Sequence, residues 1–447
     1  MQKDNFVSSL EKKYPKYHKL KYESATVSIQ DVQKKVLKED ECLLEYFVNK
    51  EAIYVFRLQK TTTDFIKIPK DSSFYQDIRL FRRALSGFSF LSEQPKLSYE
   101  LFTETSHKLY QNILAPVLAD VSAHSLIIVP SDVLGHIPFE ALLETASSEE
   151  YSRDIYRRLD YLLHKFEVAY SYSSTVLLNN LEQSSQTPNS QLLAFAADYK
   201  DIDSAKTSLR SPVHVTLRRH LLPLPAAQKE VEDLEQLYEG QFLYKAASNE
   251  ASFKELAPQY GIIHLAMHGI LDKKHPMQSS LAFTENGDSL EDNFAHAYEL
   301  SNMKLNAGLV VLSACETGYG KFQQGEGIMS LANSFMHAGV PSLLVSLWQV
   351  NDQSTATLMK FFYKELANGV HKNKALCQAK LRYLKNAQGI AAHPAFWAPF
   401  IQLGDTTPIS LELKNSGFSW VFYLLICSGV VLLTMVLYYK KRSTNPQ

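Results

Sequence analysis

Short apolar runs alternate with stretches of helical periodicity through the rear two-thirds of the chain. An apolar run of four to six residues that ends at a turn is typical of a fully buried strand, and apolar residues at every third or fourth position indicate a helix against a core. The strand-like runs cover residues 125–129, 192–197, 262–267, 309–312 and 343–347, and the helix-like stretches cover 225–238, 328–338, 353–366 and 374–386. This alternation predicts a mostly parallel α/β sheet covered by helices.

The front of the chain has a different pattern. Residues 5–40 show helical spacing, and two β-rich runs at 42–48 and 52–58 flank a turn, with a third run at 64–68. These runs predict a hairpin with an added strand, followed by amphipathic helices over 74–85 and 99–118. A stretch rich in Ser, Gln, Pro and Asn at 182–191 is typical of an exposed connection. We therefore expect a helical lead-in (1–40), an N-terminal half with α+β character (41–190) and a second α/β half (191–410).

Residues 418–439 contain no charged side chain, and a basic tail at 440–447 follows them. About 20 apolar residues are needed to cross a bilayer, and aromatic residues near both ends of the run resemble an interfacial belt. The pattern predicts a transmembrane helix that anchors the chain in a lipid bilayer; a buried core helix is the alternative. No signal peptide is recognisable at the start of the chain, which favours a tail anchor with the rest of the protein on the cytoplasmic face.

Composition narrows the function classes. The formal net charge of -1 gives no global field that would attract nucleic acid. The four cysteines, Cys42, Cys315, Cys377 and Cys427, are too few for a disulfide framework in a chain of 447 residues. We therefore expect free thiols and no nucleic-acid partner.

Two reactive side chains follow buried strands of the predicted sheet. His268 comes directly after the run 262–267, and Cys315 follows the run 309–312. Because the carboxyl ends of neighbouring parallel strands meet at one edge of a sheet, an imidazole and a thiol there would share a crevice. Backbone N–H groups of Gly269 and Cys315 are available as oxyanion donors. The pattern favours a cysteine nucleophile with a histidine base, although a lone cysteine is often a small buried hydrophobe.

Other sites are disfavoured. His264 and His268 lie roughly 13 Å apart on one strand, too far to share a metal ion. The run 318–322 departs from the phosphate-loop pattern at two positions. We therefore expect no metal and no cofactor. His136, in the loop after the run 125–129, has no nucleophile near it in sequence, and a structural or exposed role is favoured.

Several motifs together resemble the CHAT domain, a caspase-like peptidase family related to separase and often attached to tetratricopeptide repeats. The motifs are His268-Gly269 and residues 312–318 (LSACETG), 325–327 (GEG), 338–341 (AGVP), 346–352 (SLWQVND) and 393–398 (HPAFWA), with earlier signatures at 43–47, 128–130, 138–142 and 224–227. The resemblance covers roughly residues 40–405. Cys315 lies 47 positions after His268, a separation that also resembles the caspase spacing.

The resemblance implies a caspase-like sheet sandwiched by helices, with a pseudo-protease-like N-terminal half. It implies His268 as general base, Cys315 as nucleophile, and Gly269 and Cys315 as oxyanion donors. Asp352 would face a basic substrate side chain, and an N-cap role is the alternative. Glu316 would share that pocket or hold the loop.

These inferences predict a membrane-anchored cysteine endopeptidase that cuts a protein or peptide substrate after Arg or Lys. The chain has no internal repeat of fixed period, so a separate repeat-protein regulator is a possible partner. The alternative is a scaffold or partner-gated interaction module with the same fold. A small-molecule hydrolase that uses the same dyad is a weaker third option.

Overall fold

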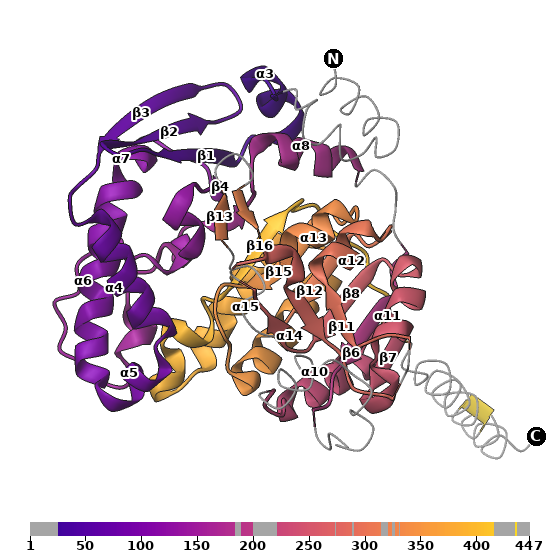
Figure 1. The fold of residues 1–447 in the computed structure, drawn as a ribbon. Helices are drawn as coiled ribbons and strands as arrows, with labels where there is room; N and C mark the ends of the chain where they lie inside the picture. The colour runs from indigo at the N-terminus through magenta and orange to yellow at the C-terminus, as the bar shows by residue number, and fades with distance from the viewer. Residues whose placement is uncertain are drawn as a thin grey trace, which may run out of the picture.

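The fold is built on one sheet of eleven strands (Figure 1). The computed structural model describes residues 26–183, 189–199, 221–272, 274–287, 290–313, 321–323, 327–329, 331–414 and 434–435. The sheet order is β3-β2-β1-β4-β5-β16-β15-β12-β8-β6-β7. Its strands are β1 (Glu41–Val48), β2 (Ala52–Leu58), β3 (Thr63–Pro69), β4 (Ser125–Val129), β5 (Glu167–Tyr170), β6 (Leu192–Ala196), β7 (Gly240–Tyr244), β8 (Ile262–Ala266), β12 (Leu309–Leu312), β15 (Ser342–Ser346) and β16 (Phe400–Gly404).

Two parallel blocks meet in the middle of this sheet. Strands β1, β4, β5 and β16 run parallel to one another, and so do β15, β12, β8, β6 and β7. Strand β16 is antiparallel to β15, with Ser346 opposite Phe400. The carboxyl ends of β8, β12 and β15 therefore lie at one edge of the sheet, and those of β4 and β5 lie at the other. The expected α/β character is confirmed. At the far end of the sheet, the hairpin strands β1 and β2 pair antiparallel, and the added strand β3 pairs antiparallel with β2.

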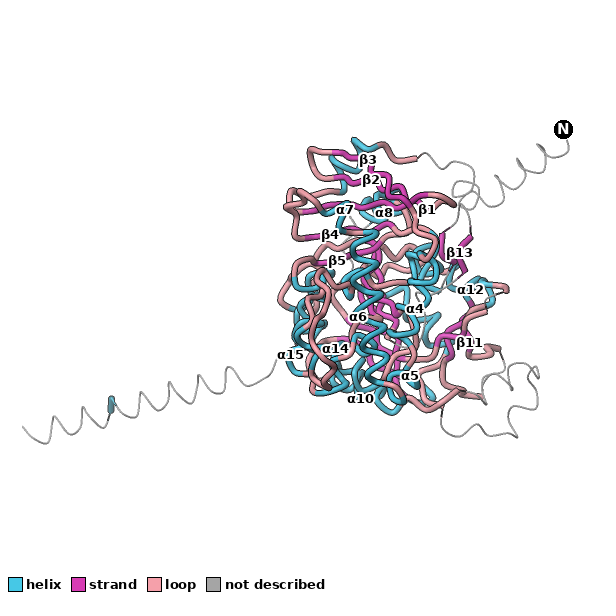
Figure 2. Tube along the Cα trace, turned by 90° about the vertical axis from the view of Figure 1, so that its left-hand side faces the viewer, coloured by secondary structure: helices cyan, strands magenta, loops and turns pink. Residues whose placement is uncertain are grey.

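Helices cover both faces of the sheet (Figure 2). They are α3 (Ile29–Asp31), α4 (Phe74–Ser86), α5 (Phe88–Glu93), α6 (Pro95–Ile113), α7 (Ala115–Leu118), α8 (Ser174–Gln183), α10 (Pro225–Glu235), α11 (Glu250–Leu256), α12 (Ala297–Asn302), α13 (Leu331–His337), α14 (Asp352–Ala367) and α15 (Lys372–Asn386). Helix α13 begins at Leu331, later than the expected 328, because Gly327–Met329 forms β14 with β13 (Lys321–Gln323). A separate three-stranded sheet contains β9 (Gly269–Ile270), β10 (Ser280–Ala282) and β11 (Phe294–His296). Of the expected lead-in, residues 1–25 lie outside the described residues.

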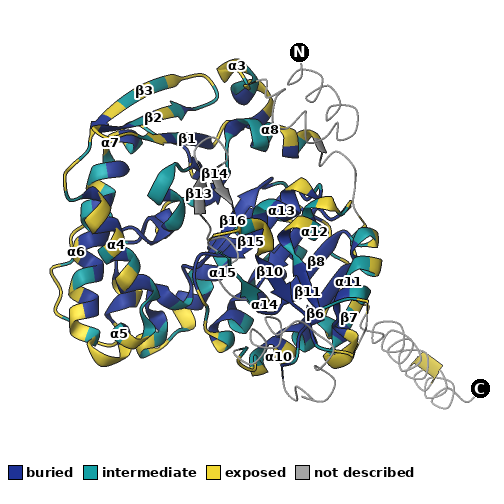
Figure 3. Cartoon of the chain, viewed as in Figure 1, coloured by how far each residue is buried: buried dark blue, intermediate teal, exposed yellow. Residues whose placement is uncertain are grey.

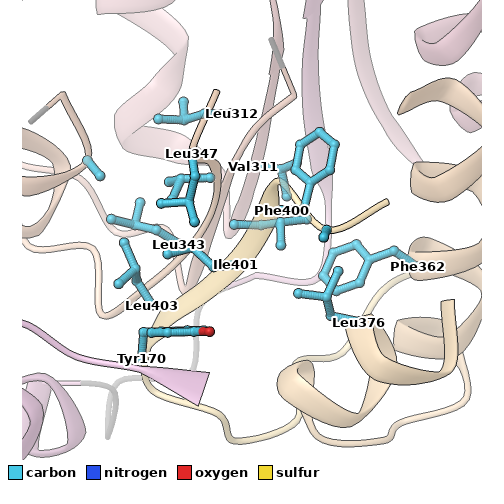
Figure 4. Packing of buried hydrophobic residues seen from close by; sticks show 14 of the residues in the cluster. Tyr170, Val311, Leu312, Leu343, Leu347, Phe362, Leu376, Phe400, Ile401 and Leu403 are labelled. Atoms are coloured by element: carbon cyan, nitrogen blue, oxygen red, sulfur yellow. The ribbon is translucent and has the colours of Figure 1, made fainter. Parts of the chain in front are cut away.

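The central strands are buried along their whole length (Figure 3). Strand β16 is covered on both faces. On one face, Phe400 lies beside Phe362 of α14 and Leu376 of α15 (Figure 4). Ile401 and Leu403 alternate with Phe400 along the strand and are also buried. Continuous apolar runs with no polar alternation are what a sheet covered on both faces requires.

A buried ion pair lies within the block that contains β4, β5 and β16. Lys380 of α15 and Glu140, which follows β4, are 1% and 3% exposed, and their Nζ and Oε1 atoms lie 2.6 Å apart. Lys380 also donates to the Phe400 carbonyl at 2.6 Å, and the Tyr170 hydroxyl donates to Glu140. The pair therefore connects helix α15 and strand β16 to β5, the parallel neighbour of β16 in the same block.

The membrane prediction is corrected. Of the apolar run 418–439, only Thr434 and Met435 are among the described residues. Within the described part of the chain, no helix has both the length and the apolar character needed to cross a bilayer. On this finding the expected transmembrane helix and membrane localisation are wrong. The lipid bilayer, expected as a partner through residues 418–439, has no support in the described part of the chain. Hydropathy reports only the preference of side chains for lipid, whereas a span needs about 20 residues in one continuous helix. The basic tail 440–447 lies outside the described residues.

His393 is completely buried in the aromatic core. Its ring stands edge-on to Tyr156 with centroids 4.5 Å apart, and its Nδ1 accepts a hydrogen bond from the Ala395 amide at 3.0 Å. Burial lowers the pKa of His393 to about 3. The folded protein therefore keeps this imidazole neutral at pH values at which an unfolded chain protonates it.

We predict that replacing Lys380 with Met lowers the free energy of unfolding by about 3–5 kcal/mol, because Glu140 then stays buried without its counter-charge. Chemical denaturation of both proteins measures the difference. Lys96→Met is the control, since Lys96 and Glu100 form an exposed pair at 3.9 Å. Such a pair contributes about 0–1 kcal/mol. Equal losses in the two variants would contradict the prediction.

We also predict acid sensitivity from His393. Its pKa is depressed by folding, so stability is lost as the pH falls from the unfolded value of about 6.5 towards 3, with a slope of up to about 1.4 kcal/mol per pH unit. His393→Asn keeps an oxygen that can accept from Ala395 and removes the titrating group. The variant should show a shallower fall in unfolding free energy between pH 6 and pH 4, as measured by denaturation across that range. Parallel pH profiles would show that His393 contributes nothing to acid sensitivity.

Candidate active site

His268 lies just beyond the carboxyl end of β8, at the edge where β12 also ends. Leu312, the last residue of β12, lies opposite Leu265 of β8, and the Ser313 amide donates to the Leu265 carbonyl at 3.1 Å. Cys315 and Glu316 come next in the chain and lie outside the described residues. The structure therefore brings the strand that precedes Cys315 beside the strand that precedes His268.

Two hydrogen-bonded routes link the backbone of His268 to that of Ala282, and one of them runs through the hydroxyl of Tyr199. The Ala282 amide donates to the His268 carbonyl at 2.9 Å. In the reverse direction, the His268 amide donates to the Tyr199 hydroxyl at 2.9 Å, and that hydroxyl donates to the Ala282 carbonyl at 2.6 Å. The Tyr199 ring also packs against the imidazole, with centroids 4.9 Å apart. Tyr199 thus holds both the backbone and the ring of His268.

A backbone carbonyl sets the tautomer of the imidazole. His268 Nε2 lies 2.8 Å from the Leu222 carbonyl oxygen. Because a carbonyl only accepts hydrogen bonds, Nε2 must carry the proton, and Nδ1 is then the basic nitrogen of the neutral ring. Burial lowers the pKa of His268, and the bond to Leu222 opposes this shift. A neutral ring with basic Nδ1 is the state that a general base needs.

Gly269 directs its amide away from the small sheet. Gly269 lies opposite Leu281, and the preceding pair is His268 with Ala282. Hydrogen-bonded and non-bonded pairs alternate in antiparallel ladders, so the N–H of Gly269 points away from β10. This orientation leaves the Gly269 amide available to a group outside the ladder.

Asp352 is the first residue of α14 but does not act as its cap. The cap is Asn351, whose side chain accepts from the Ser354 amide at 3.1 Å, so the N-cap alternative for Asp352 is wrong. Asp352 is half-buried, and among the described residues it forms no ion pair with Lys or Arg. Burial and, second, the nearby Glu230 carboxylate raise the pKa of Asp352, while a hydrogen bond from the Ala226 amide lowers it. The carboxylate therefore lacks a counter-charge in the described structure.

A buried carboxylate, that of Glu230, lies close to this site, and it was not predicted from the sequence. Glu230 of α10 is 4% exposed and lies with its Oε1 2.8 Å from His264 Nε2. The Tyr363 hydroxyl of α14 lies 3.1 Å from His264 Nδ1. A carboxylate in a helix is normally assigned to solvent because of its charge, whereas the packing of α10 on β8 and α14 buries Glu230. Tyr199 and the Leu222 carbonyl were missed for a similar reason, since neither carries a sequence signal of its function.

His136 keeps a structural role. Arg82 of α4 donates to its backbone carbonyl, and the second guanidinium nitrogen lies 3.5 Å from the Leu347 carbonyl. Burial, with a smaller contribution from Arg82, lowers the pKa of His136 to about 4. His136 therefore belongs to the packing between α4 and the end of β15.

One group of carboxylates in the described structure could be considered for a metal ion. Ligand atoms of Glu250, Glu291 and Glu299 lie within 4.8 Å of one another. The Lys254 ammonium contacts the three at 2.9, 2.7 and 2.9 Å. The lysine already supplies the positive charge that such a group requires.

We predict that Tyr199→Phe loosens the His268 backbone without removing the ring contact. Loss of the hydroxyl leaves the His268 amide and the Ala282 carbonyl unpaired, which should lower the unfolding free energy by about 1–3 kcal/mol. Hydrogen exchange at the His268 amide should accelerate. Tyr260→Phe is the matched control, because its hydroxyl bonds only to the exposed Gln241 at 2.9 Å. Unchanged exchange at His268 in Tyr199→Phe would contradict the assignment.

Comparisons with known sequences find matches over much of this chain. The CHAT domain family model matches residues 103–405. Tetratricopeptide repeat protein 28 from Homo sapiens is 23% identical over 345 residues, which cover 68% of this chain and 13% of that protein. The Mus musculus protein of the same name is 28% identical over 114 residues, or 26% of this chain and 4% of that protein. The chain thus spans only a small part of these relatives.

A solved structure shows a similar fold. The Saccharomyces cerevisiae separase in its complex with securin matches with a TM-score of 0.53 and 10% identity, over 86% of this chain and 31% of separase. The Arg-specific cysteine proteinase gingipain R matches with a TM-score of 0.36 and 10% identity, over 76% of this chain and 77% of that one. The separase match shows a mixed α/β fold of the caspase-like type. From the extent of the family match, this chain belongs to the CHAT domain family.

Proposed function

We propose that this CHAT domain is a cysteine endopeptidase in which Cys315 is the nucleophile and His268 the general base. The observation that carries the proposal is the His268 tautomer, with Nε2–H donated to the Leu222 carbonyl at 2.8 Å. This bond leaves Nδ1 as the proton acceptor of a neutral, buried ring. Support for Cys315 comes from Ser313, which is hydrogen-bonded to Leu265 and stands two residues before the cysteine. Two residues span at most about 7 Å, and this short separation supports Cys315 as the nucleophile that we propose for His268.

The proposed reaction has two stages. His268 Nδ1 takes the Cys315 proton, and the thiolate attacks the peptide carbonyl to give a tetrahedral oxyanion. The N–H groups of Gly269 and Cys315 would stabilise that charge. His268 then gives the proton to the leaving amine, which departs as a thioester forms. Water, deprotonated by His268, hydrolyses the thioester and restores the thiol.

We also propose that Asp352 selects Arg or Lys before the scissile bond. Asp352 lies at the start of α14, after β15, and therefore at the same sheet edge as His268. Asp352 has no cationic partner among the described residues, and a half-buried carboxylate of this kind gains most when a guanidinium or ammonium group enters beside it. Glu316 is the second acid proposed for this pocket.

A partner-gated module is the second candidate. The similarity to Tetratricopeptide repeat protein 28 supports it, because the name of that relative points to helical repeats and this chain spans 13% of its length. We propose that a repeat protein, or a repeat region, recruits the substrate or regulates the dyad. This candidate predicts that the domain alone has no peptidase turnover and gains it only with a repeat partner.

We predict that the full chain cleaves peptides with Arg or Lys before the scissile bond, and that Cys315→Ala lowers kcat/KM by about a thousandfold or more. Cys377→Ala is the matched thiol control, because burial raises the pKa of Cys377 to about 12 and keeps it protonated. Fluorogenic peptides that differ only in Arg, Lys, Asp or Leu at that position measure both rate and preference. Activity that survives Cys315→Ala would rule out the nucleophile, and a lack of Arg preference would rule out the role of Asp352.

A further inference from the structure

A cavity of about 450 Å³ is lined by residues from η1 (Val32–Val36), from helix α8 and from the end of strand β16. Helix α8 packs against η1, which directly follows α3 in the chain (Figure 1). Small-molecule sites typically have volumes of about 300–1,000 Å³, so this cavity has room for a ligand.

The cavity is separate from the candidate active site. Gly404 lines it and lies opposite Ser342, the first residue of β15. His268 instead follows the carboxyl end of β8, at the edge where β15 ends at Ser346. Ser342 and Ser346 are four residues apart on one strand, which is roughly 13 Å. A ligand in the cavity would therefore not occupy the proposed catalytic crevice.

Part of the lining is aliphatic. Leu37, Ile127 and Leu177 line the cavity and are 2%, 4% and 2% exposed. They belong to a small cluster of buried apolar residues beneath η1 and α8. Among the described residues, no aromatic ring lines the cavity. The lining therefore suits a flexible aliphatic group better than a base or sugar ring that would stack on an aromatic side chain.

The charged residues of the lining are mainly cationic. Four lysines and two glutamates line the cavity, an excess of two positive charges: Lys34, Lys35, Lys38, Lys60, Glu39 and Glu41. Glu41 already accepts from the Lys38 amide at 2.9 Å and pairs with the Lys38 ammonium at 3.7 Å. Lys34 forms no ion pair with any described residue. An anion would supply the charge that this side of the cavity lacks.

Hydrogen bonds fix the turn that carries Lys34. In this π turn the Leu37 amide bonds to the Val32 carbonyl, five residues earlier, at 3.0 Å. Gln33 Nε2 donates to the Gln59 and Thr62 carbonyls of the loop between β2 and β3 at 2.9 and 3.1 Å. Single π turns are rare and are found frequently at functional sites. The backbone beneath the cationic lining is thus held in place from two sides.

Two hydrogen-bond donors of the lining have capacity for a ligand. Lys60 Nζ uses one N–H for the Leu37 carbonyl at 2.7 Å and has two more. Thr406 is 8% exposed, and its hydroxyl has no hydrogen-bond partner among the described residues. A buried hydroxyl is costly unless a bound group satisfies it. Both donors favour a ligand rich in acceptor oxygens.

We propose that this cavity binds an amphipathic anion, a carboxylate or phosphate group on an aliphatic chain. The aliphatic chain packs on Leu37, Ile127 and Leu177. The anionic group accepts from Lys60 and Thr406 and lies within the field of Lys34. This binding is independent of the peptidase function proposed above, so either can fail without the other.

Calorimetric titration of the full chain with decanoate and with decyl phosphate tests both anionic groups on one aliphatic chain. Decanol lacks the charge and inorganic phosphate lacks the chain, so each should bind at least about tenfold more weakly than the two amphiphiles. The tighter of the two amphiphiles identifies the preferred anionic group. Equal binding of decanol, or no saturable binding of either amphiphile below about 1 mM, would overturn the proposal.

Three variants separate binding from folding. Thr406→Val keeps the shape of the side chain and removes a hydroxyl that bonds to nothing else in the described protein. It should keep the unfolding free energy and weaken decanoate binding by about tenfold. Lys34→Gln should weaken binding by about fivefold, whereas Lys50→Gln, at an exposed lysine outside the lining, should not change it. Decanoate affinity that is equal in the unsubstituted chain, Thr406→Val and Lys34→Gln would contradict the site.

Methyl NMR of the same chain locates the ligand. Decanoate should shift the methyl signals of Ile127, which lines the cavity, and leave those of Ile262 unchanged. Ile262 of β8 is equally buried but lies outside the lining. Ile127→Val and Ile262→Val assign the two sets of signals. Binding that leaves the Ile127 signals in place would show that the ligand sits elsewhere and would overturn the proposal.

Discussion

The antiparallel pairing of β16 with β15 is the constraint on which the architecture depends. It joins two blocks of parallel strands into one sheet, and it requires β16, from the end of the chain, to lie between strands of the two blocks. Parallel strands are normally linked by crossovers that keep their carboxyl ends together, so the reversal at β16 places the ends of the two blocks at opposite edges. The Lys380–Glu140 pair joins β16 to its parallel neighbour β5, and removal of either charge would leave the other buried without its counter-charge.

This junction also determines what surrounds the candidate site. Strands β8, β12 and β15 all end at one edge, and the residues that follow them include His268, the segment leading to Cys315, and Asp352. Helices α10 and α14 pack against each other, and α10 also packs on β8. Burial lowers the pKa of His268, and the Leu222 carbonyl determines which nitrogen of the neutral ring holds the proton. Burial alone would leave that choice open, because it disfavours the charged form without selecting a tautomer.

Two opposing influences act on the half-buried Asp352 carboxyl. Burial and the nearby Glu230 carboxylate disfavour its charged form, and the Ala226 amide favours it. The cap of α14 belongs to the neighbouring Asn351, not to Asp352.

Residue patterns alone were sufficient to predict the elements with the strongest periodicity. The buried strands, the front hairpin and the position of His268 at a strand end follow from local apolar runs, because a fully covered strand must be apolar on both faces. The contacts of Tyr199 and Leu222 with His268, and of Glu230 with His264, come from residues distant in sequence, and one of them uses a backbone carbonyl that has no sequence signature. Hydropathy likewise suggested a membrane helix that no described helix supports. Local patterns fix which residues are buried, but only folding determines which polar atoms meet inside the core, since that depends on how distant elements pack.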